Sequence, residues 1–216
     1  MKEAAIFDID DTLIDGNTGK IYAMTFFKEG IIGIKDVFVM GLYVLSYSIN
    51  RFDYGKAMKK AYSIVKGRDE AEIKNIIAKH HKTLVRPLIN KKIKNELNRH
   101  KKKGRIIILA TNSWFEMASP IAEDVKADML LATEAVKKDG KFTGGIKKTC
   151  YGRNKMSRVK EFARENNIDL KKSYAYSDHY SDRWLLSIAG NPVAVNPDRK
   201  LRKHAAEKGW QVMNVR

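Results

Sequence analysis

Five short apolar runs, separated by segments with helical periodicity, constrain the fold of this chain more than any other feature. The runs have the length of buried strands and are bounded by polar turns; they span residues 4–8, 105–110, 129–132, 173–177 and 192–195. Between them, apolar residues recur every three or four positions, as in residues 88–100 and 155–165. This alternation predicts an α/β fold in which a parallel sheet carries helices on both faces.

One long segment interrupts the alternation. Residues 17–86 carry helical patterns and no convincing strand, and this length exceeds a simple crossover between neighbouring strands. We therefore expect residues 17–86 to form an inserted helical cap domain, and residues 1–16 and 87–216 to form the core that holds the sheet. Within the core, Asp139-Gly140 lies between two strand-like segments and predicts a β-hairpin turn.

The formal net charge is +17, and two strongly basic runs span residues 91–105 and 199–208. A basic surface can attract nucleic acid, anionic lipid or a polyanionic substrate. No aromatic-interleaved nucleic-acid motif accompanies the lysines and arginines. We therefore favour solvated helix faces over a nucleic-acid partner.

The sequence also bears on the compartment. Asp8 ends the first apolar run too early for a signal peptide. The longest uncharged run, residues 37–50, is shorter than the roughly 20 residues that a bilayer span needs. Cys150 is the only cysteine, which excludes an intrachain disulfide and fits a reducing compartment. We expect a soluble cytoplasmic protein without a transmembrane segment, in which Cys150 is a small buried residue.

Two aspartates follow the first strand, in the stretch FDIDDTL of residues 7–13. Side chains two apart on a strand share a face, so Asp8 and Asp10 can project together from its carboxyl end. Open α/β sheets bind ligands at that end. Two close carboxylates repel, which favours one ionised and one protonated form. The pair can therefore supply a nucleophile and a proton donor.

Other polar residues follow later strands or open a predicted helix. They are Thr111 and Asn112, Lys155, and Asp178 and Asp182. Mg²⁺ binds carboxylates, waters and phosphate oxygens. Phosphoryl transfer needs cations and hydrogen-bond donors around the transferring oxygens. These positions therefore predict one phosphate site at the carboxyl edge of the sheet.

In this order and spacing, the motifs resemble those of the haloacid dehalogenase (HAD) superfamily, subfamily IB, the phosphoserine phosphatase-like group. Asp8, Asp10 and Thr12 match its Asp-x-Asp-x-Thr motif. Single residues match the next two motifs, Thr111 and then Lys155, and an acidic pair matches the fourth, Asp178 and Asp182. The resemblance covers nearly the whole chain and includes the helical insert. It implies a Rossmann-like HAD core with an inserted all-helical cap domain.

The resemblance also implies roles for the matched residues. Asp8 would attack phosphorus, and Asp10 would protonate the leaving group and then activate water. Asp8, Asp10 through its backbone carbonyl, and Asp178 would hold Mg²⁺.

The other matched residues would complete the phosphate site. Thr111, the backbone N–H of Asn112, and Lys155 would neutralise the phosphoryl oxygens, with Thr111 and Lys155 counted among the catalytic residues. Asp182 would support the site from behind, although it could instead cap the next helix.

Some positions depart from the family pattern. Asp11 stands where the superfamily most often has Gly, and Ser177, His179 and Ser181 replace usual residues of the fourth motif. Asn17 lies where serine-specific members tend to carry a Glu for the substrate ammonium group. A neutral Asn17 therefore predicts that L-phosphoserine is a poor substrate.

Several aromatic residues and histidines receive structural interpretations. His80, His81 and His100 have no companions at zinc-ligand spacing, so we expect them at the surface. Trp114 and Trp184 lie near motif residues, and we expect core packing rather than substrate stacking. Residues 37–49 are apolar nearly all round, which favours a buried cap helix or helix pair; an apolar wall facing the leaving group is the alternative.

We therefore expect a Mg²⁺-dependent phosphomonoesterase that acts on a small organic phosphate through an aspartyl-phosphate intermediate. Two alternatives remain open: a phosphotransferase, and a phosphatase acting on nucleotide or nucleic-acid phosphate termini. A non-catalytic binding module is disfavoured because Asp8, Asp10 and Lys155 are all present.

Overall fold

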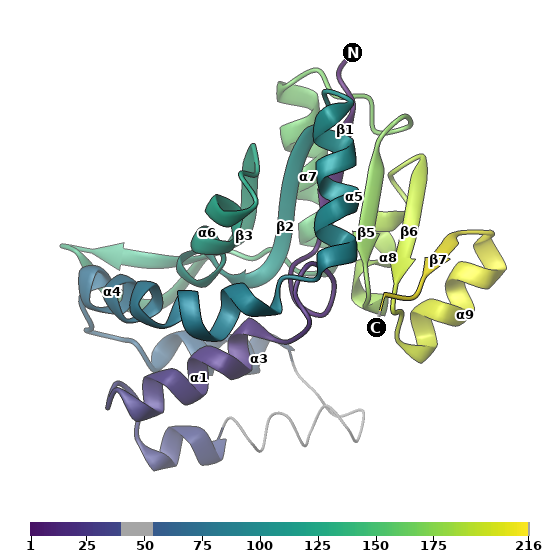
Figure 1. Cartoon of the computed structure of the whole chain (residues 1–216). Helices are drawn as coiled ribbons and strands as arrows, with labels where there is room; N and C mark the ends of the chain where they lie inside the picture. The colour runs from purple at the N-terminus through teal and green to yellow at the C-terminus, as the bar shows by residue number, and fades with distance from the viewer. Residues whose placement is uncertain (40–53, 216) are drawn as a thin grey trace.

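The computed structural model describes residues 1–39 and 54–215. They contain a seven-stranded sheet with the order β4-β3-β2-β1-β5-β6-β7 (Figure 1). The strands are β1 (Ala4–Phe7), β2 (Ile106–Trp114), β3 (Met129–Lys138), β4 (Lys141–Lys148), β5 (Tyr174–Ser177), β6 (Asn191–Val195) and β7 (Gln211–Met213). Neighbouring strands are parallel except β3 and β4, which form the antiparallel hairpin predicted around Asp139-Gly140.

Helices precede or follow most strands, as the alternating pattern predicts. Those described in full are α1 (Thr18–Lys28), α3 (Tyr54–Ser63), α4 (Glu70–His80), the π-helix η1 (His81–Val85), the 3₁₀ helix η2 (Arg86–Leu88), α5 (Lys91–Lys102), α6 (Phe115–Asp124), α7 (Gly152–Glu165), the 3₁₀ helix η3 (Tyr180–Asp182), α8 (Arg183–Leu186) and α9 (Arg199–Lys208). Residues 34–39 are also helical. Asn90 and Asp198 accept hydrogen bonds from backbone N–H groups at the starts of α5 and α9, which is the usual way a helix start is capped.

The core lies on both faces of the sheet. Side chains alternate in direction along a strand, and β1 shows this directly. Ala5 and Phe7 pack in one apolar cluster with Ile93 and Leu97 of α5. Ala4 and Ile6 pack in a second cluster, which includes residues from α7, α8 and α9. The sheet is therefore buried on both sides, and its central strands can be continuously apolar.

Helices α1, α3 and α4, which precede α5 in the chain, lie at one edge of this sheet. Figure 1 shows α1, α3 and α4 below the ends of the central strands, at the side where β1 and β2 end. No strand occurs among the described residues of this segment, 17–39 and 54–86. The apolar stretch 37–49, expected to be a buried helix, lies for the most part outside the described residues.

The strands differ in extent from the sequence-based boundaries. β2, expected to end at residue 110, continues to Trp114 because Trp114 pairs with Thr133 of β3 after a register shift. The last strand, β7, has no strongly apolar pattern and was not expected. It pairs with the edge of β6, so tertiary pairing rather than local sequence determines it.

The prediction that three histidines lie at the surface is wrong for two of them. His81 is buried, and its Nε2 lies 2.8 Å from Oδ2 of Asp124. His100 is also buried, with its Nε2 2.8 Å from the Tyr176 hydroxyl. The spacing of histidines along the sequence does not predict such contacts, because the partners come from distant parts of the chain.

The cysteine and tryptophan predictions have a mixed outcome. Cys150 is buried, as expected. Trp114 is buried and packs against Tyr62, with ring centroids 4.5 Å apart. Trp184 is only half-buried, and the guanidinium groups of Arg153 and Arg183 lie over its ring at 4.3 and 4.4 Å. The expected core packing is therefore correct for Trp114 but not for Trp184.

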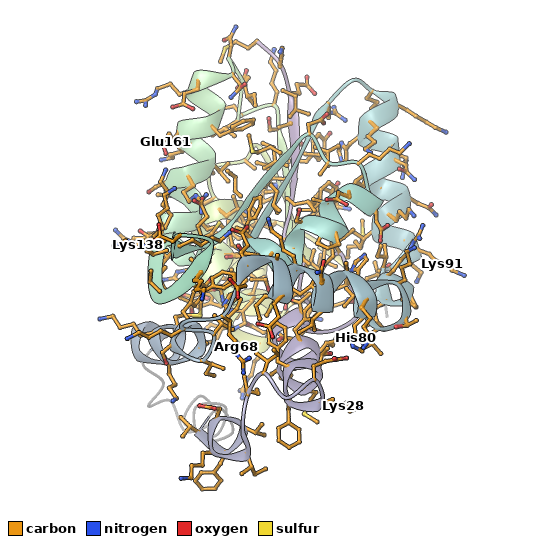
Figure 2. All side chains as sticks on the ribbon, turned by 90° about the vertical axis from the view of Figure 1, so that its left-hand side faces the viewer. Lys28, Arg68, His80, Lys91, Lys138 and Glu161 are labelled. Atoms are coloured by element: carbon orange, nitrogen blue, oxygen red, sulfur yellow. The ribbon has the colours of Figure 1, made fainter. Side chains whose placement is uncertain are left out.

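Basic side chains are distributed widely. In Figure 2, Lys28 of α1, Lys91 of α5 and Lys138 of β3 lie on different sides of the molecule. Among residues 1–39 and 54–215, no helix has both the length and the apolarity to cross a membrane.

Candidate active site

The loop after β1 places Asp8 and Asp10 at the carboxyl edge of the sheet. The Asp8 N–H donates to the Tyr176 carbonyl of β5, which continues the strand pairing by one residue. The chain then turns, with the Ile14 N–H donating back to the Ile9 carbonyl over 3.0 Å. Asp11 has a φ of 55°, in the left-handed region that glycine favours and aspartate tolerates. Asp11, which departs from the Gly expected from the family resemblance, therefore holds a backbone conformation that glycine adopts readily.

Asp8 forms a buried ion pair with Lys155. The Lys155 ammonium donates to Oδ1 of Asp8 over 3.0 Å and to Oδ2 of Asp182 over 2.5 Å. Ser177 also donates to this Asp182 oxygen, over 2.8 Å. These groups come from the end of β1, the first turns of α7 and the loop after β5, so the sheet order β1-β5 brings distant segments together.

Burial and charge perturb both members of this pair. Burial raises the pKa of Asp8, Lys155 opposes that shift, and the neighbouring carboxylates of Asp182, Asp178 and Asp10 add to it. The net pKa of Asp8 lies well above its ordinary value. Burial would lower the pKa of Lys155, but Asp182 and Asp8 outweigh it, so the net pKa is raised and the ammonium stays charged.

Asp10 is held in a different network. The Thr18 hydroxyl and backbone N–H both donate to Oδ1 of Asp10, over 2.7 and 2.5 Å. The Ser113 hydroxyl donates to Oδ2 over 2.5 Å. Burial raises the pKa of Asp10 in spite of these hydrogen bonds. The carboxyl group therefore has a defined orientation and holds its proton at a higher pH than a free aspartate.

Asp178 is the third carboxylate at this edge. The Thr12 hydroxyl donates to Oδ1 of Asp178 over 3.1 Å. Burial, followed by the charge of Asp11, raises the pKa of Asp178 to about 7. Asp178 also raises the pKa of Asp8, so these two carboxylates repel each other in a site where Lys155 is the cation that contacts Asp8.

This arrangement fits a divalent oxygen-binding cation. A cation between Asp8 and Asp178 would relieve the repulsion that raises their pKa values. Among the described residues, no group of three or more His, Cys, Asp or Glu side chains could hold a metal ion by itself. Mg²⁺ meets this limit, since it commonly uses one or two carboxylates together with waters and substrate phosphate.

The end of β2 contributes Thr111 and Asn112. Thr111 is fully buried, and its hydroxyl accepts a hydrogen bond from the Ser113 N–H over 3.1 Å. Asn112 is half-buried at the same strand end. This part of β2 therefore lies beside Asp10, which Ser113 contacts directly.

Two positions have local structural roles. Asn17 is the N-cap of α1, and its side-chain oxygen accepts from the Lys20 N–H over 3.0 Å. Asp182 precedes α8 at the N-cap position, but its side chain makes no capping bond. Its side chain instead contacts Lys155 and Ser177.

Sequence analysis did not assign roles to the four hydroxyl groups that orient the carboxylates. Thr18 and Ser113 hold Asp10, Thr12 holds Asp178, and Ser177 holds Asp182. Thr12 belongs to the first motif, and the other three lie within a few residues of a motif position, which was the only signal. Which hydroxyl contacts which carboxylate depends on how the strands and α1 pack.

The chain belongs to the haloacid dehalogenase-like hydrolase family, whose model matches residues 5–187. This agrees with the four motifs and with the α/β fold. The chain is therefore an enzyme of the phosphatase type within this family, and its relatives include proteins named for phosphatase activity.

Three relatives illustrate the range of names. A probable phosphatase of Mycobacterium tuberculosis is 30% identical over 217 residues, covering 99% of this chain and 75% of that protein. A phosphoserine phosphatase of the same organism is 29% identical over 218 residues, covering 99% and 71%. A histidinol-phosphatase of Neisseria meningitidis is 26% identical over 224 residues, and the match covers 100% of both chains.

A solved structure shows the same fold over the whole length. A protein of unknown function from Bordetella pertussis superposes with a TM-score of 0.91 at 23% identity, covering 100% of each chain. The fold is thus shared well beyond close sequence similarity.

Proposed function

We propose that this protein hydrolyses a small organic phosphomonoester through an aspartyl-phosphate intermediate on Asp8. The observation that carries the proposal is the different treatment of two adjacent carboxylates. Oδ1 of Asp8 contacts Lys155, and no described residue donates a hydrogen bond to Oδ2. Both oxygens of Asp10 are held by hydroxyl or N–H donors. One carboxylate can therefore attack, while the other is oriented for proton transfer.

The reaction would proceed in two steps, transfer of the phosphoryl group to Asp8 and then its transfer to water. In the first, an Asp8 oxygen bonds to phosphorus, the bond from phosphorus to the ester oxygen breaks, and Asp10 gives that oxygen a proton. In the second, Asp10 takes a proton from water, the water oxygen bonds to phosphorus, and the bond to Asp8 breaks. Phosphate leaves, and both aspartates return to their starting forms.

Lys155, Thr111 and the backbone N–H of Asn112 would bind the transferring phosphoryl oxygens. Lys155 suits this role because its ammonium stays charged while buried, where an electrostatic contact is stronger than in water. Asp182 and Ser177 hold the ammonium from the other side.

Mg²⁺ is the cofactor that this donor set fits. Asp8, the Asp10 backbone carbonyl and Asp178 would hold it, with waters and substrate oxygens as the remaining ligands. When bound, it would neutralise charge on the phosphoryl group. This assignment leaves the Asp10 side chain in its network with Thr18 and Ser113.

The domain assignment is part of the proposal. Residues 17–86 would be a cap that excludes water during the first step, and residues 1–16 and 87–216 the catalytic core. Two features support this division: helices α1, α3 and α4 lie at the carboxyl edge of the sheet (Figure 1), and Thr18, the first residue of α1, contacts Asp10.

The leaving group of the proposed substrate carries no positive charge. Asn17 has no formal charge, and its side-chain oxygen already caps α1. A buried ammonium group without a carboxylate partner is costly. Relatives are named for phosphoserine and histidinol phosphate, so both compounds belong in the test panel.

The test is a panel of phosphomonoesters, measured with Mg²⁺ and with excess chelator. We expect turnover of at least one ester whose leaving group is uncharged. This activity should be lost in chelator and should return with Mg²⁺. Trapping with a beryllium fluoride analogue should place the adduct on Asp8. Undiminished activity in chelator, or an adduct on another residue, would contradict the assignment. For specificity, kcat/KM for L-phosphoserine should be low and should rise in Asn17→Glu.

Two alternatives are measured in the same assay. Added alcohols that yield new phosphate esters would indicate phosphotransfer. Preferred turnover of nucleotide or nucleic-acid termini, with binding that weakens steeply with salt, would indicate a polyanionic substrate, for which the net charge of +17 is the supporting observation.

A further inference from the structure

The first helices of the insert expose an unusual number of large apolar side chains. On α1, Met24 is 52% exposed and Phe27 is 36% exposed; in the helical residues 34–39, Ile34 and Phe38 are 67% and 68% exposed. Large apolar side chains are usually among the most buried residues of a folded domain. Scattered exceptions are normal, but four within residues 24–38 form a candidate binding surface.

Helix geometry places these side chains on outward faces. Met24, Phe27 and Lys28 are three and four residues apart and share one side of α1, opposite the buried Tyr22 and Phe26. Ile34 and Phe38 are four residues apart and share a face in the same way. In Figures 1 and 2, α1 and the helical residues 34–39 lie at the end of the molecule that is opposite the N-terminus and the amino end of β1.

Positive charge borders the apolar side chains. Lys28 follows Phe27, Lys35 follows Ile34, and both lysines are exposed. Neither lysine forms an ion pair with any residue in the described parts of the chain. Both charges are therefore accessible to an external anion.

The neighbouring acidic groups are already neutralised. Oε1 of Glu29 lies 2.9 Å from Nζ of Lys79 and 2.5 Å from Nε2 of His80. Oδ1 of Asp36 lies 3.3 Å from Nζ of Lys60. The outward face thus combines apolar side chains with unpaired positive charge.

We propose that the basic apolar surface, formed by Met24, Phe27, Lys28, Ile34, Lys35 and Phe38, docks on an anionic membrane. Interfacial helices bind by inserting apolar side chains at the headgroup level while lysines contact anionic lipid. Charge decides between this occupant and a second copy of the chain. A symmetric contact through this surface would bring Lys28 and Lys35 close to their own copies, whereas anionic lipid complements them. The net charge of +17 adds long-range attraction to the same partner.

The inference is independent of the proposed reaction, because it concerns binding and not turnover. The test is sedimentation of the full chain with vesicles of phosphatidylcholine alone, and with vesicles that also contain about one third phosphatidylglycerol. We expect binding to the second kind only, weakened by salt. The double variant Ile34→Ser/Phe38→Ser should bind about tenfold more weakly, since it loses the inserted side chains.

Matched controls separate this surface from general basicity. Lys28→Glu/Lys35→Glu should weaken binding by about tenfold or more, whereas Lys92→Glu/Lys102→Glu, with the same change in net charge on α5, should have a much smaller effect. Leu84→Ser/Val212→Ser serves as the control for exposed apolar side chains. Melting temperatures check that each variant is folded, and the lysine pair keeps the test decisive if the apolar pair unfolds.

Three results would overturn the proposal. The first is no binding to phosphatidylglycerol vesicles. The second is an equal loss of binding in the α5 variant and the Lys28/Lys35 variant, which would indicate non-specific attraction. The third is a wild-type dimer that the Ile34/Phe38 variant converts to monomer, which would assign the surface to a second copy of the chain.

Discussion

Two buried polar clusters lie against the same central strands and differ in how their charges are balanced. In one, carboxylates repel each other; in the other, each polar group has a partner. At the carboxyl edge, Asp8 and Lys155 remain close to further carboxylates, and burial and repulsion raise the pKa of Asp8. Beside the same strands, His100 of α5 contacts Tyr176 of β5 and Arg105, which precedes β2.

The His100 cluster is satisfied and carries no net charge, because Nε of Arg105 donates to Oε2 of Glu3 over 2.8 Å. Arg105 donates to Nδ1 of His100 over 3.1 Å, so Nε2 carries the proton and donates to the Tyr176 hydroxyl. Burial, followed by the charge of Arg105, lowers the pKa of His100 to about 4. Tyr176 also stacks on Phe7 with ring centroids 4.4 Å apart. A buried polar cluster therefore indicates a functional site only where charged groups repel one another, as the carboxylates around Asp8 do.

The largest expected effect tests the charged cluster. Asp8→Asn should lower kcat by about 10⁴-fold or more, since an amide cannot form the covalent intermediate. The melting temperature should change little, because Lys155 keeps its contact with Asp182. The control is Asp139→Asn in the β3–β4 turn, which should retain full activity. Substantial turnover by Asp8→Asn would show that the Asp8 carboxylate is not the nucleophile.

The second prediction tests whether Lys155 balances the buried carboxylates. Lys155→Met should lower kcat by about 10³-fold and destabilise the fold by about 3 kcal/mol near neutral pH, since Asp8 and Asp182 lose their shared cation. The loss of stability should shrink in acid, where Asp8, whose pKa is raised, becomes protonated. Chemical denaturation at two pH values measures this, with the exposed Lys92→Met as the control. An unchanged free energy of unfolding would show that the charges are compensated by other groups.

The third prediction tests the orientation of Asp10. Ser113→Ala removes the donor to Oδ2 and should lower kcat by about 10- to 100-fold, since misdirected general acid–base catalysis is slower. KM and the melting temperature should remain near wild-type values, because Ser113 does not belong to the proposed phosphate site. Ser119→Ala on α6 is the matched control. A change in KM with kcat unchanged would assign Ser113 to substrate binding instead.

The smallest effect concerns the neutral cluster. His100 has a folded pKa of about 4, below the ordinary 6.5, so between these values the unfolded chain binds more protons than the folded one. Stability should therefore rise as pH increases from about 4 to about 6.5, by about 2 kcal/mol. His100→Gln should flatten this slope with little change in kcat. A large loss of kcat would give the neutral cluster a catalytic role.

The fold was predictable where local pattern and tertiary pairing agree. The strand at residues 4–8, the helix that presents Ile93 and Leu97, and the Asp139-Gly140 turn each carry the periodicity or turn chemistry of the element that they form. β7 and the last residues of β2 carry no such signal. Their backbone is extended because a neighbouring strand supplies hydrogen-bond partners.

The sequence by itself determined the α/β class, the order of the motifs and the edge of the sheet where Asp8, Asp10, Lys155 and Asp178 meet. It could do so because spacing along a strand or helix sets which residues share a face. Only the tertiary structure decided that Ser113 and Thr18 hold Asp10, and that His81 and His100 are buried. Those outcomes depend on contacts between segments far apart in the chain, and neither local periodicity nor residue type encodes which distant group will lie within hydrogen-bond distance.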